Sequence, residues 1–131
     1  MGEHMTLSII TPEKELFKGE ISKLFTENAY GKMEVLPKHL DMIALLKPTI
    51  TEFIDEKDNR RKLFTSNGVL TIQEENIVIS CEAAEWPEDV DKNRALEAKK
   101  RAEERMHKKD ADIDMKRAEA ALYRSLIRLS I

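Results

Sequence analysis

Six arginines occupy the last third of the chain, and their spacing follows the period of an α-helix. They form two rows, Arg94, Arg101 and Arg105 in the first and Arg117, Arg124 and Arg128 in the second. An α-helix advances about 100° per residue, so each row occupies a narrow stripe on its own helix. A guanidinium donates two parallel hydrogen bonds that fit a phosphate group. The rows therefore indicate a candidate site for a phosphorylated anion.

Acidic residues in the same segment offer a simpler explanation for these rows. Asp91, Glu97 and Glu104 could neutralise the arginines as surface ion pairs, each contributing about 0–1 kcal/mol. Asp91 also suits the N-cap of a helix, because its side chain can accept a hydrogen bond from a free backbone N–H. From the residues alone, surface pairing is the plainer of the two interpretations.

Two helices must position the arginines, and the pattern predicts them at about 91–108 and 112–129, with a turn near 109–111. Small or apolar residues recur at helical spacing beside each row. They are Ala95, Ala98, Ala102 and Met106 in the first helix and Ala118, Ala121, Leu122, Ser125, Leu126 and Leu129 in the second. Alanines allow close approach but bury little area. We expect an antiparallel hairpin that is weakly held and able to change shape.

Ahead of the helices, residues 6–84 read as short strands divided by turn residues. The predicted strands are 7–9, 15–18, 21–25, 33–36, 42–46, 49–54, 62–65, 69–73 and 77–81, the second ending at Gly19. This spacing predicts an antiparallel β-sandwich or barrel. Cys81 alternates with Ile77 and Ile79, which predicts a buried strand position. Pro87 interrupts the last strand, so we expect a sandwich domain at 5–86 and a helical domain at 87–131.

Composition limits the function. The 131 residues carry a net charge of −3, with 36% charged and 5% aromatic residues. This negative net charge argues against nucleic acid as a partner. Residues 91–131 hold 12 Lys/Arg and 8 Asp/Glu and the rest of the chain is acidic, so the two parts should behave as different surfaces. One cysteine fits a reducing compartment, and no apolar run approaches the ~20 residues of a membrane span. Residues 1–4 read as a cloning remnant, with Met5 as the natural start.

Several short motifs follow one another in an order that resembles a known family. They are Ile10-Thr11-Pro12, Leu36-Pro37-Lys38-His39, Ser66-Asn67-Gly68-Val69-Leu70, Asp91-Lys92-Asn93-Arg94-Ala95, Arg101-Ala102-Glu103 and Arg117-Ala118-Glu119. No single motif is specific, but their order across residues 5–131 resembles the epsilon subunit of bacterial F-type ATP synthases.

The resemblance implies a sandwich of about ten strands followed by an antiparallel two-helix hairpin. It implies a non-catalytic rotor subunit that links the gamma subunit to the polar loops of the c-ring. The helices would switch to an extended form that reaches the alpha and beta subunits and inhibits ATP hydrolysis. The subunit would lie at the cytoplasmic face of the bacterial cell membrane, held there only through the complex, with no nucleic acid and no required cofactor.

The resemblance also implies ATP as a regulatory ligand, because Val90-Asp91-Lys92-Asn93-Arg94-Ala95 is similar to the family's (Ile/Leu)-Asp-x-x-Arg-Ala motif. Residues expected near the base are Glu85, Val90, Asp91 and Ala95. Residues expected near the phosphates are Arg94, Arg101, Arg124 and Arg128. ATP would then stabilise the folded hairpin.

The chain departs from the family pattern in two loops. The resemblance implies a contact loop for gamma and the c-ring at Lys32, Met33, Glu34 and His39, where the family usually has Gly-Glu-Leu-Gly before Leu-Pro-Gly-His. Lys32 therefore reverses a charge at the c-ring contact. Asn67 replaces the first glycine of a Gly-Gly pair, and because asparagine tolerates left-handed backbone, we expect the turn to persist.

Two other functions remain as alternatives. One is a free-standing soluble protein that senses nucleotides outside the synthase. The other is an RNA-binding β-barrel, which the acidic sandwich and scarce aromatic residues disfavour.

Overall fold

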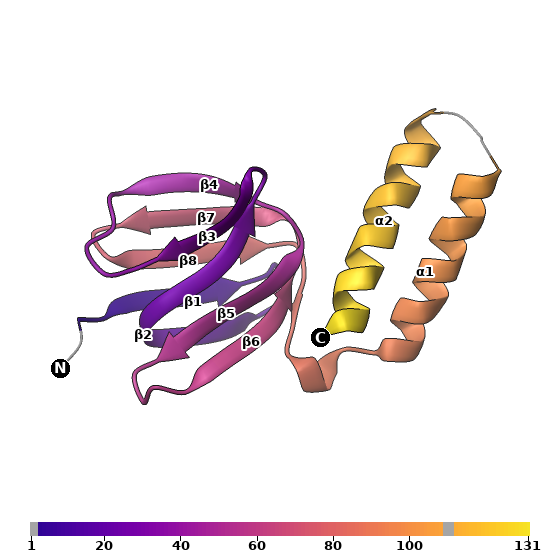
Figure 1. Ribbon diagram of the computed structural model, residues 1–131. Helices are drawn as coiled ribbons and strands as arrows, with labels where there is room; N and C mark the ends of the chain where they lie inside the picture. Colours follow the sequence, from indigo (N-terminus) through magenta and orange to yellow (C-terminus); the bar gives the residue numbers. More distant parts are fainter. Residues whose placement is uncertain (1–2, 109–111) are drawn as a thin grey trace. The chain divides into compact units, whose positions relative to one another are not determined.

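The computed structural model describes residues 3–108 and 112–131, with side chains of the second helix described from Met115 onward. The chain divides into two compact units, Met1–Pro87 and Glu88–Ile131. The described residues form nine strands in the first unit and two long helices in the second (Figure 1). This confirms the predicted order of a β-sandwich followed by a helical hairpin.

The sandwich has two layers that share one long strand. Its strands are β1 (Met5–Ile10), β2 (Glu15–Asn28), β3 (Gly31–Val35), β4 (Met42–Leu46), β5 (Thr49–Asp55), β6 (Arg60–Thr65), β7 (Gly68–Gln73), β8 (Asn76–Cys81) and β9 (Ala84–Glu85). One layer contains β1, β8, β7 and β4, and the other contains β3, β5, β6 and β9. Figure 1 shows β4, β7 and β8 on one side and β5 and β6 on the other.

Strand β2 connects the layers. Its first half pairs with β1, its second half pairs with β3 and β5, and the pairing with β5 is irregular between Ile21 and Lys23. The prediction that a strand ends at Gly19 is therefore wrong, because Gly19 pairs with Leu7 inside the ladder. A Cβ atom at Gly19 would lie 3.0 Å from the Phe17 ring, which covers this position.

Two features of the sheet differ from the sequence-based prediction. Strand β1 runs parallel to β8, whereas every other strand pair of the described residues is antiparallel. The short strand β9 pairs with the end of β6 and lies in a segment that the pattern left outside the strands. Both pairings join residues that are distant in sequence, so periodicity does not reveal them.

The core between the layers is aliphatic. Its largest fully buried members include Leu7, Ile9, Leu24, Phe53, Leu63, Leu70, Ile77 and Ile79. Cys81 is 4% exposed, which confirms its predicted burial, and this burial raises the pKa of its thiol to about 11. The buried hydroxyls of Thr26, Thr51 and Thr65 form a row of hydrogen bonds, 2.9 and 2.7 Å long, across β2, β5 and β6. Each buried hydroxyl is thereby satisfied.

Gly68 has a different role from the one predicted. Neither Asn67 nor Gly68 has the left-handed backbone that we expected at this turn. Instead, a Cβ atom at Gly68 would lie 2.4 Å from the Ser80 carbonyl oxygen and 2.8 Å from the Cys81 Cα. Glycine is thus required because β7 and β8 approach closely here.

Left-handed backbone occurs elsewhere, at Lys38 with φ 67° and at Glu74 and Glu75 in the β7–β8 turn. The two sites are connected, because the Lys38 N–H donates to Glu75 Oε1 at 2.9 Å and the Glu74 N–H donates to Asp41 Oδ1 at 3.0 Å. These bonds fix the loop after β3 on the β7–β8 turn.

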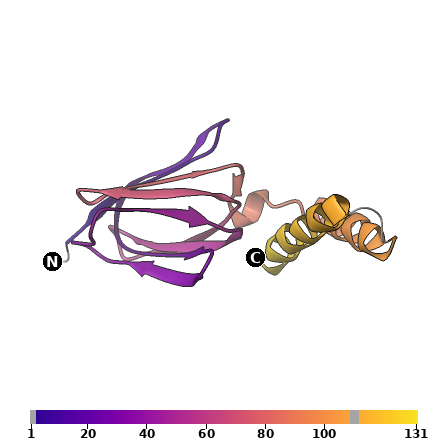
Figure 2. The ribbon, with the colours of Figure 1, turned by 90° about the horizontal axis from the view of Figure 1, so that it is seen from above.

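The second unit begins with a short 3₁₀ turn, Pro87–Asp89, followed by α1 (Lys92–His107) and α2 (Asp112–Ser130). The helices run antiparallel side by side (Figures 1 and 2). Asp91 is the N-cap of α1, as predicted, and its Oδ1 accepts from the Arg94 N–H at 3.0 Å. The predicted turn at 109–111 lies outside the described residues.

The packing face of the hairpin contains the predicted small side chains, and the predicted Met106, Leu122 and Leu129 are partly buried. Ala95, Ala102, Ala118 and Ser125 are buried. Leu126, however, is 44% exposed, so its assignment to this face is wrong. Ala118 and Ser125 are seven residues apart and define the axis of contact, and Leu126 lies one residue, about 100°, away from it.

Replacing Gly68 by alanine should lower the free energy of unfolding of the sandwich by about 1–3 kcal/mol. The added Cβ atom would collide with the backbone of Ser80 and Cys81, which would have to move. Urea denaturation followed by the fluorescence of Trp86 measures this. Gly19→Ala is the matched control and should change stability by less than about 1 kcal/mol, since a ring edge can give way. Equal effects of the two changes would contradict the packing explanation.

Candidate functional site

One side chain shows which turns of α1 and α2 lie beside each other. It lies at the end of the hairpin where α1 begins and α2 ends, here called the open end. Lys92 Nζ donates to the carbonyl oxygens of Arg128 and Leu129, each at 3.0 Å. The first turn of α1 therefore lies beside the last turn of α2. In this register Ala95 is level with Ser125 and Ala102 with Ala118, consistent with the burial of all four.

The same register brings the predicted phosphate-binding residues to one part of the hairpin. Arg94 is level with the turn of α2 that contains Arg124 and Arg128, and Arg101 lies two turns further along α1. Arg94 and Arg101 are exposed, whereas Arg124 and Arg128 are partly buried. Four of the arginines expected to bind an anion thus belong to two facing helix segments.

Five of the six arginines in the rows have no carboxylate partner among the described residues. In the described part of the hairpin, Arg94, Arg101, Arg105, Arg117 and Arg124 have no ion-pair partner within 4.0 Å. Asp91, which could have served, is occupied as the helix cap. Surface pairing, the plainer interpretation of the rows, is therefore not supported for these five residues.

The residues expected near a base lie in both units. Val90 and Ala95 are buried, and Asp91 caps α1 directly between them in sequence. Glu85 belongs to the first unit, where it is partly buried and pairs with Phe64 as part of β9.

The residues of the expected contact loop do not form one loop. Lys32, Met33 and Glu34 lie on strand β3, and His39 lies in the loop that follows the far end of this strand. Lys32 and Glu34 are exposed, whereas Met33 packs against the core. The His39 Nδ1 atom is 2.7 Å from the Leu40 carbonyl oxygen. Only Lys32 and Glu34 therefore present charge on the strand itself.

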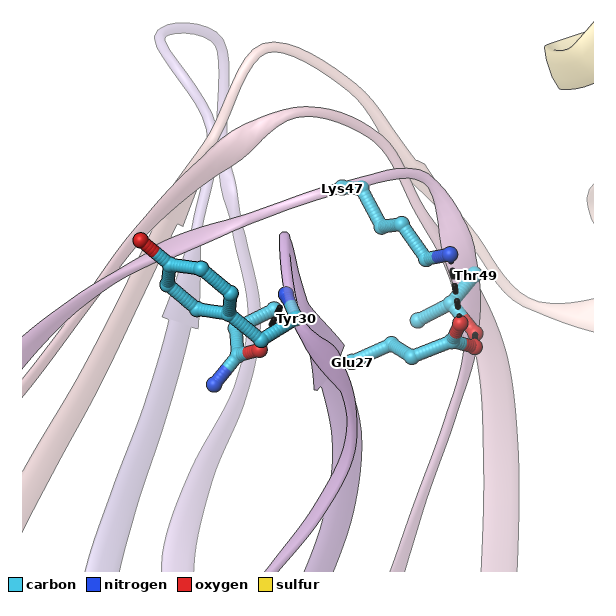
Figure 3. A network of polar contacts seen from close by, with 5 residues as sticks. Glu27, Tyr30, Lys47 and Thr49 are labelled. Carbon is cyan, nitrogen blue, oxygen red and sulfur yellow. Dashed lines mark hydrogen bonds and ion pairs between the residues drawn. The ribbon is translucent and has the colours of Figure 1, made fainter.

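A polar network lies beside the β2–β3 turn and was not predicted (Figure 3). Glu27 Oε2 pairs with Lys47 Nζ at 2.8 Å, and Glu27 Oε1 accepts from the Thr49 hydroxyl at 2.9 Å. Lys32 is the cross-strand neighbour of Glu27. The hydrogen bond from Lys47 is the main cause that lowers the pKa of Glu27, helped by Thr49 and by the charge of Lys32 and opposed by burial.

Tyr30 marks the tip of the same turn. Its side chain is 99% exposed, and its backbone N–H donates to Asn28 Oδ1 at 2.8 Å. Figure 3 shows the ring directed away from Glu27, Lys47 and Thr49. The Asn28-Ala29-Tyr30-Gly31 sequence could have indicated a turn with an exposed aromatic residue.

An exposed apolar surface lies on β4 and β7 and is here called the β4–β7 patch. It consists of Ile43, which is 75% exposed, Leu45, which is 69% exposed, and Val69, the cross-strand neighbour of Leu45. The alternate residues Ala44 and Leu46 are buried in the core. Strand β4 is apolar on both faces, which is typical of a strand that is covered on both sides.

Other classes of site are not found in the described residues. No group of three or more His, Cys, Asp and Glu side chains there could hold a metal ion. No helix searched is long and apolar enough to cross a membrane. A sandwich with an exposed apolar surface, followed by a helical hairpin that carries two rows of arginines, defines the chain as a binding module.

Comparison with known proteins identifies the family. Residues 4–87 match the β-sandwich domain of the ATP synthase delta/epsilon chain, and residues 88–131 match its long α-helix domain. The chain belongs to the ATP synthase epsilon-chain family and is a non-catalytic subunit. It is 49% identical to the epsilon chain of Clostridium novyi, covering 100% of this chain and 99% of the relative, and 43% identical to that of Clostridium kluyveri, covering 100% and 98%.

Solved structures share the fold at low sequence identity. A chain of the Euglena gracilis mitochondrial ATP synthase superposes with a TM-score of 0.73 at 19% identity, covering 98% of this chain and 76% of that chain. A chain of the Tetrahymena thermophila central stalk and c-ring superposes with a TM-score of 0.70 at 13% identity, covering 98% and 96%.

Replacing Lys47 by methionine should raise the pKa of Glu27, because the main hydrogen bond to the carboxylate is lost. A lowered pKa stabilises the fold above the unfolded-state pKa of about 4.3, and this stability is lost as the pH falls through the folded-state value. The stability difference between wild type and Lys47→Met should therefore be largest near neutral pH and shrink in acid. NMR titration of the Glu27 carboxyl measures the pKa, with Lys23→Met as control. An unchanged pKa would contradict the assignment.

Proposed function

We propose that this chain is a rotor subunit of the central stalk that links the gamma subunit to the c-ring and restrains ATP hydrolysis through its helical hairpin. Family membership and the two-unit architecture support the stalk role. The proposed regulation depends on two states of the hairpin, one folded as described here and one extended. As part of the complex, the chain would lie at the cytoplasmic face of the bacterial membrane.

The observation that carries the regulatory proposal is that Arg94, Arg101 and Arg124 have no carboxylate partner among the described residues. Guanidiniums brought to facing helix segments repel one another unless an anion lies among them. The triphosphate of ATP supplies such an anion, with Arg94, Arg101, Arg124 and Arg128 as donors. Val90, Asp91 and Ala95, at the start of α1, would meet the base and ribose end.

The weak packing of the hairpin explains how ATP could control it. The four buried side chains of the hairpin are small and bury little apolar area, so we expect only a small free-energy difference between the closed and the open form. A ligand that binds only the closed form stabilises it by RT ln(1 + [L]/Kd), which reaches about 2.7 kcal/mol at a hundred times Kd. ATP would hold the hairpin folded, and loss of ATP would release it for inhibition.

The β4–β7 patch suits the contact with gamma, because exposed apolar surface on a folded chain indicates a protein interface. The β2–β3 turn suits the c-ring contact, with Tyr30 at the tip and Lys32 and Glu34 on β3. Lys32 is cationic where the family usually has glutamate. The polar loop that it meets should therefore offer a carboxylate or carbonyl oxygen at that position.

Calorimetry on the isolated chain tests the nucleotide site. Arg94→Ala and Arg101→Ala should each weaken ATP binding at least about tenfold, since each removes a charged hydrogen-bond donor. Arg105→Ala is the control, because it removes the same charge nearer the closed end of the hairpin, and it should change Kd by less than about twofold. Absence of binding at millimolar ATP, or equal effects of the three variants, would contradict the proposed nucleotide site.

Co-purification with gamma tests the docking surface. Leu45→Glu should leave the free chain folded, since the side chain is 69% exposed, and should abolish recovery with gamma, because a carboxylate would be buried without a partner. Lys62→Glu on β6 is the control and should co-purify normally. If wild type does not bind gamma, the stalk role itself fails and the free-standing nucleotide sensor becomes the better account.

A further inference from the structure

Lys92 joins the start of α1 to the end of α2 by hydrogen bonds. It lies in the first turn of α1, and its ammonium group is 3.0 Å from both the Arg128 and the Leu129 carbonyl oxygens in the last turn of α2. Lys92 is the first variable residue of the Asp-x-x-Arg-Ala motif, at a position where the motif specifies no residue type. We propose that Lys92 is an electrostatic latch that holds the hairpin closed by capping the C-terminus of α2.

The chemistry of the α2 terminus explains why a lysine fits there. The last four carbonyl groups of a helix have no partner within the helix, and the terminus carries a partial negative charge. The Ser130 hydroxyl satisfies one of them by donating to the Ile127 carbonyl oxygen at 2.7 Å. Lys92 satisfies the next two from the other helix, so these bonds provide partners for three of the four terminal carbonyl groups.

The latch acts only in the closed register. When α2 leaves α1, the ammonium group and the two carbonyl groups return to water, and the charge no longer lies on the helix axis of α2. Because both partners are exposed, water replaces part of the interaction. The contribution is therefore modest, but it acts on a hairpin whose buried face is four small residues.

Lys92 also adds to the positive charge at the end of the hairpin where Arg94, Arg124 and Arg128 lie. Closing the hairpin brings Arg94, Arg124 and Arg128 to the same end. Arg94 and Arg124 have no carboxylate partner among the described residues. Lys92 adds a fourth cation, but its charge is directed into the negative end of the α2 dipole. Lys92 thus favours closure without nucleotide, and ATP favours it further. This regulatory meaning rests on the proposed function, whereas the latch itself does not.

Fluorescence energy transfer between dyes at Leu96→Cys and Leu126→Cys reports hairpin opening in the isolated full chain. Both positions are exposed and lie near the open end. The native Cys81 is buried and its pKa of about 11 keeps the thiol protonated at neutral pH, so labelling is selective. The measurement is made without nucleotide over rising temperature, until both forms are populated.

Lys92→Met keeps the aliphatic stem and removes the charge, and it should raise the open-to-closed ratio about three- to fivefold. Lys100→Met, an equal charge change on the same helix, should leave the ratio unchanged, and Lys92→Arg should restore most of the closure. If opening of the hairpin also unwinds the helices, the loss of helical circular dichroism on heating should be larger for Lys92→Met than for Lys92→Arg and Lys100→Met. A ratio for Lys92→Met equal to that for Lys100→Met overturns the latch.

Calorimetry with ATP separates this inference from the proposed function. If wild type binds no ATP but Lys92→Met still opens the hairpin, the nucleotide site fails and the latch stands. If ATP binds and Lys92→Met opens nothing, the latch fails alone. When both hold, ATP should restore closure of Lys92→Met, because binding to the closed form shifts the equilibrium.

Discussion

The behaviour of the hairpin depends on how little its two helices bury against each other. Ala95, Ala102, Ala118 and Ser125 form its contact face, and none of them carries a large apolar side chain. An interface of this kind allows the backbones to approach closely but buries little apolar area at each buried position. In the proposed function, polar contacts at the helix ends and a bound anion would therefore decide whether the hairpin is closed.

The sandwich shows the opposite design. Its core is built from fully buried aliphatic and aromatic side chains, and strand β2 belongs to both layers, so the layers cannot slide independently. The buried threonine hydroxyls align β2, β5 and β6, because a shift of register would leave them without partners. The proposed function needs both designs, because a rigid sandwich can carry contact surfaces and a weakly packed hairpin could change its conformation.

Charge is distributed according to the same division. In the sandwich, a few of the described acids and bases form ion pairs, as between Glu27 and Lys47 or Glu52 and Arg60. In the described part of the hairpin, five arginines lack such partners, and Asp91 and Lys92 are used to cap helix ends. Unneutralised cations beside a weak interface give an anionic ligand a larger effect on conformation than it would have on a well-packed fold.

Local pattern was enough to determine the strand-rich first part, the two helices, the Asp91 cap, the small-residue face and the burial of Cys81. Each of these depends on neighbours within about one turn or one strand, so periodicity and residue type carry the information. Tertiary structure alone decided the continuity of β2, the parallel β1–β8 pair, the close approach at Gly68, the separation of His39 from Lys32 and the reach of Lys92 to α2. These features join residues far apart in sequence, and a one-dimensional pattern does not specify which distant segments meet.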